Sequence, residues 1–281
     1  MRSQQENTLS VLNIHRRYQR LIGWLSASYL GLRIISVFAL LLIWWFITEK
    51  GWVDPIILPS PKQVIAQLVS AAGDLGFMGV TLWEHLWASL SRILLALLSA
   101  VIIGIPVGIA MGISKKIQAI LDPWIEFYRP VPPLAYLPLI VIWFGIGEFS
   151  KILLIWASML PPVILSTVAG VQNANVTRIR AARSLGANRR QLLTNIILPN
   201  ALPEILIGLR IGLGVGWSTL VAAELIAATQ GLGFMVQSAG EFLSTDMVIA
   251  GICVIALIAC TLELGLRVLQ KRLVPWYGAK Q

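Results

Sequence analysis

Charged residues are scarce in this chain. Asp, Glu, Lys and Arg make up 12% of the 281 residues, whereas hydrophobic residues make up 57%. The charged share is roughly half of that in an ordinary globular domain. So little charge cannot cover the surface of a water-soluble protein of this length. The composition therefore excludes an ordinary soluble domain and predicts a membrane protein.

Reactive and metal-binding residues are also few. Cys253 and Cys260 stand seven residues apart in one apolar run, about 10 Å of helical rise, which is beyond disulfide reach. His15 and His85 fall on opposite sides of the predicted membrane, so they build no metal cluster. The sequence contains no G-x-x-x-x-G-K-[ST] loop. We expect no cofactor or metal in this chain, and ATP with its Mg²⁺ would bind to another subunit.

Long apolar runs are abundant, and most approach the roughly 20 residues that a helix needs to cross a bilayer. They predict an all-α, polytopic membrane protein with six transmembrane helices in a domain over residues 34–270, between an N-terminal segment 1–33 and a tail 271–281. A short amphipathic helix on the membrane surface is expected after Pro61. The six predicted spans are 34–48, 84–113, 124–147, 151–171, 201–228 and 247–269.

Basic residues gather at alternate loops, and Lys and Arg beside a span hold that end in the cytoplasm. Both termini are therefore predicted to be cytoplasmic. The same distribution explains the formal charge of +9 better than a nucleic-acid surface does. The basic residues are Arg2, Arg16, Arg17, Arg20 and Arg33, then Lys115 and Lys116, then Arg178, Arg180, Arg183, Arg189 and Arg190, then Arg267, Lys271, Arg272 and Lys280.

A hairpin at residues 178–199, between the fourth and fifth spans, carries five arginines and no acid. We expect one short helix closed by Gly186 and a second that Asn188 caps and that ends at Leu198 before Pro199. A segment of this size cannot bury a core of its own. Its apolar residues Leu185, Leu192 and Ile196 would then need an outside surface. An ordinary loop with topology arginines explains the charge but not the spacing.

The spacing of Ala181-Ala182, Gly186, Ile196 and Leu198-Pro199 resembles the EAA loop of binding-protein-dependent ABC importer permeases. Arg180 stands where that family has glutamate, which puts any ion pair of the glutamate in doubt but not the shape of the helix. The resemblance implies a coupling helix that sits in a cleft of a cytoplasmic ATPase. It assigns ATPase coupling to Arg180, Ala181, Ala182, Leu185, Gly186, Ile196, Leu198 and Pro199.

Residues 128–138 and 143–147 resemble the third-span signature of the nitrate, sulfonate, taurine and bicarbonate permeases, and residues 208–224 and 237–242 are most similar to its taurine branch. The resemblance covers about residues 80–270. It implies a type I-like importer permease of the bacterial cytoplasmic membrane, and taurine as the solute. Alkanesulfonate, nitrate and bicarbonate remain alternatives. The implied partners are a second copy of the chain, two ATPases, an extracytoplasmic binding protein and membrane lipid, with no nucleic acid.

Two features of the spans concern helix contacts. Gly208, Gly212 and Gly216 repeat every four residues, a pattern that lets helix backbones approach closely in lipid. We interpret this face as a helix contact, with pore lining as the alternative. The prolines at 130, 132, 133 and 138 leave backbone carbonyls unpaired, so the third span should kink beside a cavity or be a bent packing helix.

Charges inside the spans are candidates for the translocation path because they are costly there. Arg92, Arg210 and Glu224 are the three candidates. Either arginine could meet the sulfonate of taurine, and Glu224 its ammonium group. Snorkelling or pairing between helices is the alternative.

Two other classes of function were weighed against a transporter. A membrane enzyme would use Glu224 and Glu241 as an acid and base pair, but no His, Cys or Ser cluster accompanies them. The second class is a passive scaffold for membrane assembly. We predict no catalytic residue.

Overall fold

The computed structural model describes residues 31–32, 35–74 and 76–276, and these residues form helices joined by turns. The chain divides into two compact units, residues 1–63 and 64–281. Most of the predicted N-terminal segment, residues 1–30 and 33, and the end of the predicted tail, residues 277–281, lie outside the described residues. Among the described residues, an isolated bridge joins Phe77 and Val80, and no strand is present. The all-α class is confirmed.

The first unit holds an apolar helix over Ile35–Glu49. Its 15 residues are fewer than the roughly 20 that a perpendicular span needs. The indole nitrogen of Trp44 donates to the carbonyl oxygen of Pro59 at 3.0 Å, which holds the following turn against the helix. The predicted amphipathic helix is present as α2 (Pro61–Ala72), with Val64 and Ala71 buried.

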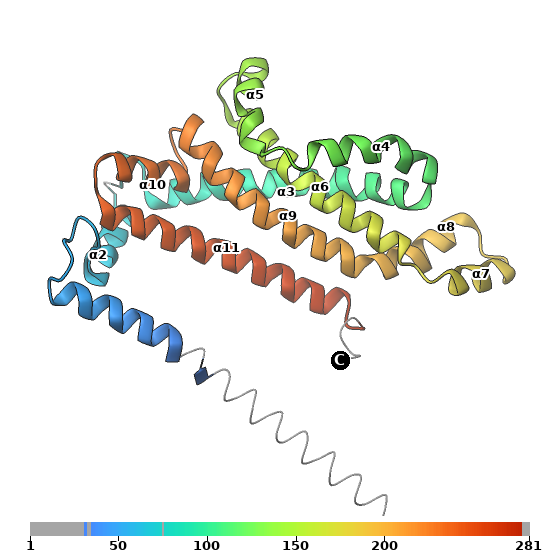
Figure 1. Ribbon diagram of the computed structural model, residues 1–281, viewed down its shortest axis with the longest axis horizontal. Coiled ribbons are helices and arrows are strands. Elements are labelled where there is room, and N and C mark those ends of the chain that lie inside the picture. The colour runs from blue at the N-terminus through green and yellow to red at the C-terminus, as the bar shows by residue number, and fades with distance from the viewer. Residues whose placement is uncertain (1–30, 33–34, 75, 277–281) are drawn as a thin grey trace, which may run out of the picture. The chain divides into compact units, whose positions relative to one another are not determined.

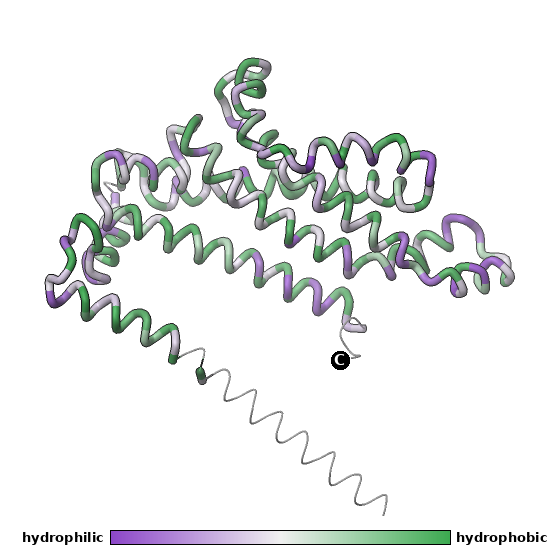
Figure 2. Tube along the Cα trace, in the orientation of Figure 1, coloured by the Kyte–Doolittle hydropathy of each residue, from purple (hydrophilic) through white to green (hydrophobic). Residues whose placement is uncertain are grey.

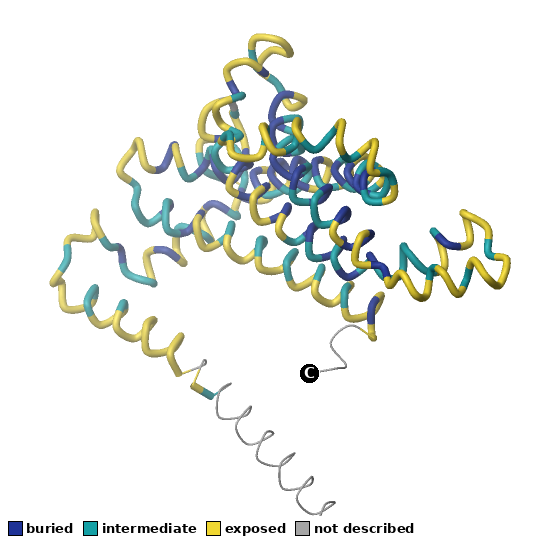
Figure 3. The backbone as a smooth tube through the Cα atoms, turned by 45° about the vertical axis from the view of Figure 1, so that its right-hand side comes forward, coloured by how far each residue is buried: buried dark blue, intermediate teal, exposed yellow. Residues whose placement is uncertain are grey.

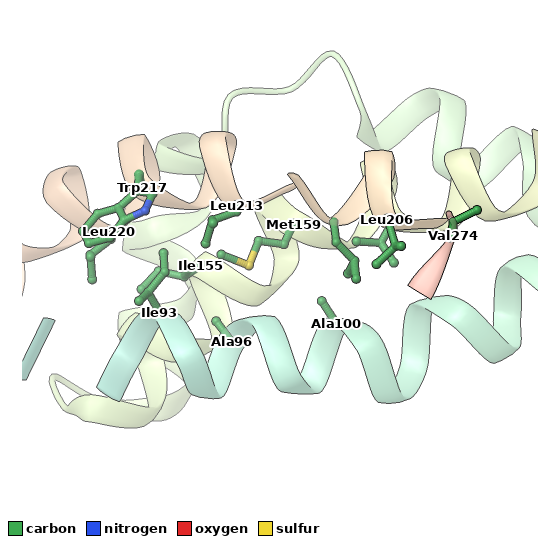
Figure 4. Packing of buried hydrophobic residues seen from close by; sticks show 12 residues of the cluster. Ile93, Ala96, Ala100, Ile155, Met159, Leu206, Leu213, Trp217, Leu220 and Val274 are labelled. Atoms are coloured by element: carbon green, nitrogen blue, oxygen red, sulfur yellow. The ribbon is translucent and has the colours of Figure 1, made fainter. Parts of the chain in front are cut away.

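The second unit is built on three long helices, α3 (Leu82–Ile113), α6 (Glu148–Gln172) and α9 (Leu198–Ala227), with α10 (Leu232–Glu241) and α11 (Thr245–Leu273) packed against α9 (Figure 1). Side chains from α3, α6 and α9 meet in one apolar core (Figure 4). Fully buried members include Ile93 and Ala96 of α3, Ile155 and Met159 of α6, and Leu220 of α9.

A capping box fixes the start of α3. The Thr81 hydroxyl accepts from the backbone N–H of Glu84 at 3.3 Å, and the Glu84 carboxylate accepts from the backbone N–H of Thr81 at 2.7 Å. Two otherwise unpaired donors of the first turn are thereby satisfied. The predicted span 84–113 therefore begins two residues early, at Leu82.

The predicted third span, 124–147, is wrong as a single kinked helix. The structure has α4 (Lys115–Tyr128), a 3₁₀ turn (Pro133–Tyr136) and α5 (Leu137–Phe144), with a bend of 92° between the two apolar parts. Proline disfavours helical geometry at the residue before it, so Pro130, Pro132 and Pro133 end one helix before the next can begin. The expected cavity beside this bend is present, with a volume of about 500 Å³.

The predicted end of the hairpin at Leu198 and Pro199 is also wrong. α8 (Arg189–Leu192) continues through a π-helical turn (Leu193–Ile197) directly into α9, so Arg189–Ile226 forms one helical rod of 38 residues. Proline is compatible with the first turn of a helix because its missing N–H has no partner there. The wider π turn before Leu198 lets the chain enter that first turn without a break.

Four helical segments of the described part of the chain are long and apolar enough to cross a membrane: Leu82–Ile113, Glu148–Gln172, Arg189–Ile226 and Thr245–Leu273. The bent pair α4 and α5 brings the number to five if it counts as one span. Apolar residues line the long helices (Figure 2), and many of these residues are exposed (Figure 3). Such an exterior suits lipid or a partner subunit, not water. Cys253 and Cys260 are unbonded, as predicted, and exposed on α11.

Candidate functional site

The hairpin consists of α7 (Val176–Ser184), a turn at Gly186 and α8, and it projects from the second unit at the opposite end from α10 (Figure 1). Gly186 has φ +85°, a conformation that favours glycine. Its N–H donates to the Arg183 carbonyl at 2.9 Å, and the N–H of Ala187 donates to the Ala182 carbonyl at 3.0 Å. These bonds close α7 in the way that glycine commonly closes helices.

Asn188 then starts α8 with a capping box. Its side-chain oxygen accepts from the Gln191 N–H at 2.8 Å, and the Gln191 side chain accepts from the Asn188 N–H at 2.9 Å. The end of α7 and the start of α8, on the two sides of the turn, are therefore both fixed by local hydrogen bonds. The shape does not depend on a buried core.

A hollow of about 390 Å³ lies inside the hairpin, between α7 and the rod that begins at α8. Leu185 stands at this hollow with 88% of its surface exposed, whereas Ile196 is half-buried and Leu192 is buried within the chain. The expectation that all three need an outside surface is thus wrong for Leu192. The hollow is lined by Ala182, Leu185, Gly186, Ala187, Gln191, Asn195 and Ile196.

The remaining signature residues divide into two groups. Arg180 and Ala181 lie on α7 with exposed side chains, and the Arg180 guanidinium has no hydrogen-bond or ion-pair partner within the described ranges. Leu198 instead packs against the apolar cluster of Val171 and Ile205, and Pro199, also half-buried, follows it in the first turn of α9. Arg180 and Ala181 therefore face outward, whereas Leu198 and Pro199 join the rod to the bundle.

At the opposite end of the bundle, Arg92 is the centre of an ion cluster that is buried except at Glu148, whose side chain is 56% exposed. Its guanidinium donates to both carboxylate oxygens of Glu148, at 2.6 and 2.7 Å, and to Glu224 at 2.6 Å. A further bond runs to the carbonyl of Gln230 at 2.9 Å. The side chain of Arg92 is 1% exposed and that of Glu224 is 0% exposed. This cluster ties α3 to α6, α9 and the turn before α10.

Glu224 also receives bonds from the chain around it. The Ser89 hydroxyl donates to its carboxylate at 2.7 Å, and the Gly233 N–H donates at 2.8 Å. A Cβ at Gly231, where φ is +135°, would lie 2.5 Å from the Glu224 carboxyl carbon. Glycine is therefore required for the α9–α10 turn to approach this buried charge. The Gly231 N–H donates in turn to Nδ1 of His85 at 3.0 Å.

Arg210 also has a partner. Its Nε donates to Glu263 of α11 at 3.0 Å, and Arg267 bonds the same carboxylate oxygen at 3.1 Å. Arg92, Arg210 and Glu224 are thus engaged in links between helices. These contacts are the helix pairing that the sequence left as an alternative, and a role of the three charges in the translocation path stays a prediction.

The three glycines of α9 lie against α6. A Cβ at Gly208 would stand 2.5 Å from Cβ of Ser166, and one at Gly212 would stand 3.3 Å from the carbonyl oxygen of Met159. A Cβ at Gly216 would overlap the Met159 side chain. α6 and α9 approach closely along this face within one chain.

Sequence reasoning missed the acids of these clusters. Glu148 and Glu263 have no motif around them, and Glu148 falls between the predicted spans 124–147 and 151–171. One signal was present: a buried arginine requires a counter-charge. Glu263 lies in the predicted span 247–269, where an ionisable residue is costly, and could have been paired with Arg210.

Comparison with known proteins identifies the class of this fold. Residues 100–275 match the family of binding-protein-dependent transport system inner membrane components. The taurine transport system permease protein TauC of Escherichia coli K12 is 61% identical over 275 residues, which cover 97% of this chain and 100% of that protein. The riboflavin transport system permease protein of Chloroflexus aurantiacus is 33% identical over 275 residues, covering 96% and 98%.

Solved structures share the architecture. Inward-facing MetNI methionine ABC transporter matches with a TM-score of 0.60 and 17% identity, over 68% of this chain and 95% of that chain. An amino acid ABC transporter matches with a TM-score of 0.55 and 21% identity, over 79% and 98%. At these identities the likeness shows the fold alone.

The family match covers more than half of the chain and agrees with the helical bundle and the projecting hairpin. The chain therefore belongs to the family of binding-protein-dependent transport system inner membrane components.

Proposed function

We propose that this chain is the permease subunit of an ATP-driven importer of taurine. The observation that carries the proposal is the 61% identity to the taurine permease protein over the whole of that protein. The riboflavin relative, at 33% identity, indicates that related permeases serve solutes of different chemistry.

The partners in this proposal are a second copy of the chain, two cytoplasmic ATPases and an extracytoplasmic binding protein. Each hairpin would dock on one ATPase through the hollow and the exposed Leu185 and Arg180. Leu185 has 88% of its surface exposed beside this concave surface, and a partner that docks there would cover it. Five arginines without an acid favour an acidic rim on the ATPase cleft.

The continuous rod suggests how force would reach the membrane. Arg189–Ile226 runs unbroken from the hairpin to the far end of α9, and the small-residue face holds α9 tightly against α6. Closure of an ATPase dimer would therefore move α8 and α9 together instead of bending a loop. The two copies would then open alternately to either side of the membrane, and the solute would cross unmodified between them.

The orientation follows from charge. The hairpin holds Arg178, Arg180, Arg183, Arg189 and Arg190, and we place it in the cytoplasm together with both termini. The Arg92 cluster and α10 then lie toward the extracytoplasmic side, where the binding protein would dock.

Uptake competition in cells tests the solute. Cells that lack their own taurine uptake would express this chain with its partner subunits and be offered radiolabelled taurine. We expect uptake that excess unlabelled taurine abolishes, and that equal concentrations of nitrate and bicarbonate leave unchanged. An alkanesulfonate is the informative competitor, because the sulfonate group alone should compete weakly. Absence of taurine uptake alongside uptake of another labelled anion would overturn the assignment.

A further inference from the structure

A cavity of about 500 Å³ lies between the turn that follows α4 and the helices α6 and α9. Its volume falls within the roughly 300–1,000 Å³ of small-molecule sites. Along α9 the lining runs from Glu204 to Val215, about 16 Å of helical rise. The cavity is therefore an elongated space beside the bend that the prolines create.

The cavity lining includes one cation and one acid. Arg129, which follows the last residue of α4, and Glu204, in the second turn of α9, both line it. Neither side chain has a hydrogen-bond or ion-pair partner in the part of the chain that the structure describes. This contrasts with Arg92, Glu224 and Arg210, which are paired. Arg129 is exposed just beyond α4, whereas Glu204 is half-buried within α9. An unpaired acid within a membrane helix is costly and marks a functional position.

The lining also includes uncharged polar groups. Ser158 and Ser166 of α6 line the same wall. The Ser158 hydroxyl donates to the Ile155 carbonyl at 2.7 Å, so its oxygen lone pairs are left to accept. Pro162 follows four residues later and has no N–H, so the Ser158 carbonyl also loses its helical donor. Hydrogen-bond acceptors therefore accumulate on this wall, and acceptors suit an ammonium group.

The charge pattern selects among solutes. A guanidinium binds a sulfonate or carboxylate through two parallel hydrogen bonds. A lone anion would also meet the Glu204 carboxylate, which repels it. A solute with a positive and a negative end satisfies both side chains and leaves no charge unpaired. Nitrate, bicarbonate and simple alkanesulfonates lack the positive end.

We infer that this cavity is a binding subsite within the permease for a zwitterionic sulfonate, with Arg129 holding the sulfonate and Glu204 the ammonium group. The inference rests on the proposed function for the identity of the solute. It adds a site at which the membrane subunit itself binds both the sulfonate and the ammonium group of the solute. The candidates from the sequence for binding these two charges were Arg92, Arg210 and Glu224, whereas the cavity is lined by Arg129 and Glu204.

Equilibrium dialysis of radiolabelled taurine against the purified permease–ATPase complex, without the binding protein, tests the subsite. Wild-type complex should bind taurine. Arg129→Gln and Glu204→Gln should each weaken binding roughly tenfold to hundredfold, because each removes a charge-assisted hydrogen bond. Arg129→Lys should recover part of the loss. Lys116→Gln and Glu126→Gln are matched controls on exposed positions of α4 that do not line the cavity, and both should bind as wild type.

Labelled ethanesulfonate separates charge recognition from misfolding. It lacks the ammonium group, so Glu204→Gln should bind it at least as well as wild type while losing taurine. Equal loss of both ligands in Glu204→Gln, or unchanged taurine binding in Arg129→Gln, would overturn the subsite. Taurine import by a wild-type complex that shows no taurine binding of its own would also overturn it, and would leave the proposed function standing. Failure of the wild type to import taurine would instead contradict the proposed function.

Discussion

Arg92 shows how a single residue can organise one end of the bundle. Its guanidinium serves Glu148, Glu224 and a backbone carbonyl at once. Removing one partner of a buried ion pair leaves the other charge without compensation, which costs more than the pair itself contributes. The position is therefore far more sensitive to truncation than an exposed charge would be.

We predict that Arg92→Ala lowers the free energy of unfolding by about 3–5 kcal/mol, because Glu224 remains buried without a cation. Thermal unfolding of the detergent-purified protein measures the effect. The matched control is Glu241→Gln, on an exposed acid that accepts a hydrogen bond from the Gln237 amide; it should change the free energy of unfolding by less than about 0.5 kcal/mol. An Arg92→Ala protein as stable as the control would show that the cluster does not hold α10.

At the scale of elements, the contact between α6 and α9 depends on small residues. Gly208 and Gly214 lie on the same helix but differ in surroundings, since an added Cβ meets Ser166 at 2.5 Å in the first case and nothing within 4 Å in the second. We predict that Gly208→Ala lowers the free energy of unfolding by about 1–3 kcal/mol, because the added methyl group overpacks the contact. Gly214→Ala should be neutral or slightly stabilising, since alanine favours helix. Thermal unfolding of the two variants side by side measures both changes. Equal losses of stability in the two variants would refute the close approach of α9 to α6 at Gly208.

The hairpin turn offers a second matched pair of glycines. Gly186 and Gly79 have φ +85° and +79°, and both have open space where a Cβ would stand. Asp at either position costs similar backbone strain, of order 1–2 kcal/mol. Because Gly186 alone lines the hollow, Gly186→Asp should reduce taurine uptake at least about tenfold with normal membrane insertion.

Gly79→Asp should leave uptake close to wild type. Co-purification of the ATPase with each variant is the accompanying measurement. If the Gly186→Asp chain retains its ATPase and imports taurine at the normal rate, the hollow is not the docking surface.

Sequence patterns anticipated elements better than their junctions. The apolar runs predicted the bounds of the long helices within a few residues. Gly186 and Asn188 predicted where α7 ends and where α8 begins. The effect of proline was predicted wrongly at two places. The prolines from Pro130 to Pro133 produce a sharp bend where a kink was expected. Pro199 does not end a helix, because the π turn before it and its position in the first turn of α9 accommodate it. Such outcomes depend on geometry several residues away, which a local pattern does not contain.

The candidate site shows the same limit. The spacing of the hairpin residues could be read directly, since all of them lie within 20 residues of one another. Partners such as Arg92 and Glu224 are 132 residues apart, and only packing of α3 on α9 brings them together. The placement of Arg129 and Glu204 at one cavity likewise depends on the bend after α4.

For the whole molecule, orientation connects the charge pattern to function. With Cys253 and Cys260 both replaced by serine, single cysteines would be introduced through Ser184→Cys on α7 and Glu241→Cys at the end of α10, both exposed. A membrane-impermeant maleimide should label the Glu241→Cys chain in intact cells and the Ser184→Cys chain only after permeabilisation. The reverse pattern would invert the topology and remove the hairpin from the ATPases.

The central claim is that this chain carries taurine inward when ATPases act on its hairpin. Proteoliposomes containing the permease–ATPase complex, with ATP and Mg²⁺ on the ATPase side and the binding protein on the other, measure this directly as accumulation of radiolabelled taurine. The account predicts accumulation against a gradient, and its loss when this chain, the ATPase, the binding protein or ATP is omitted. Accumulation that persists without ATP, or a complete system that moves no taurine, would contradict it.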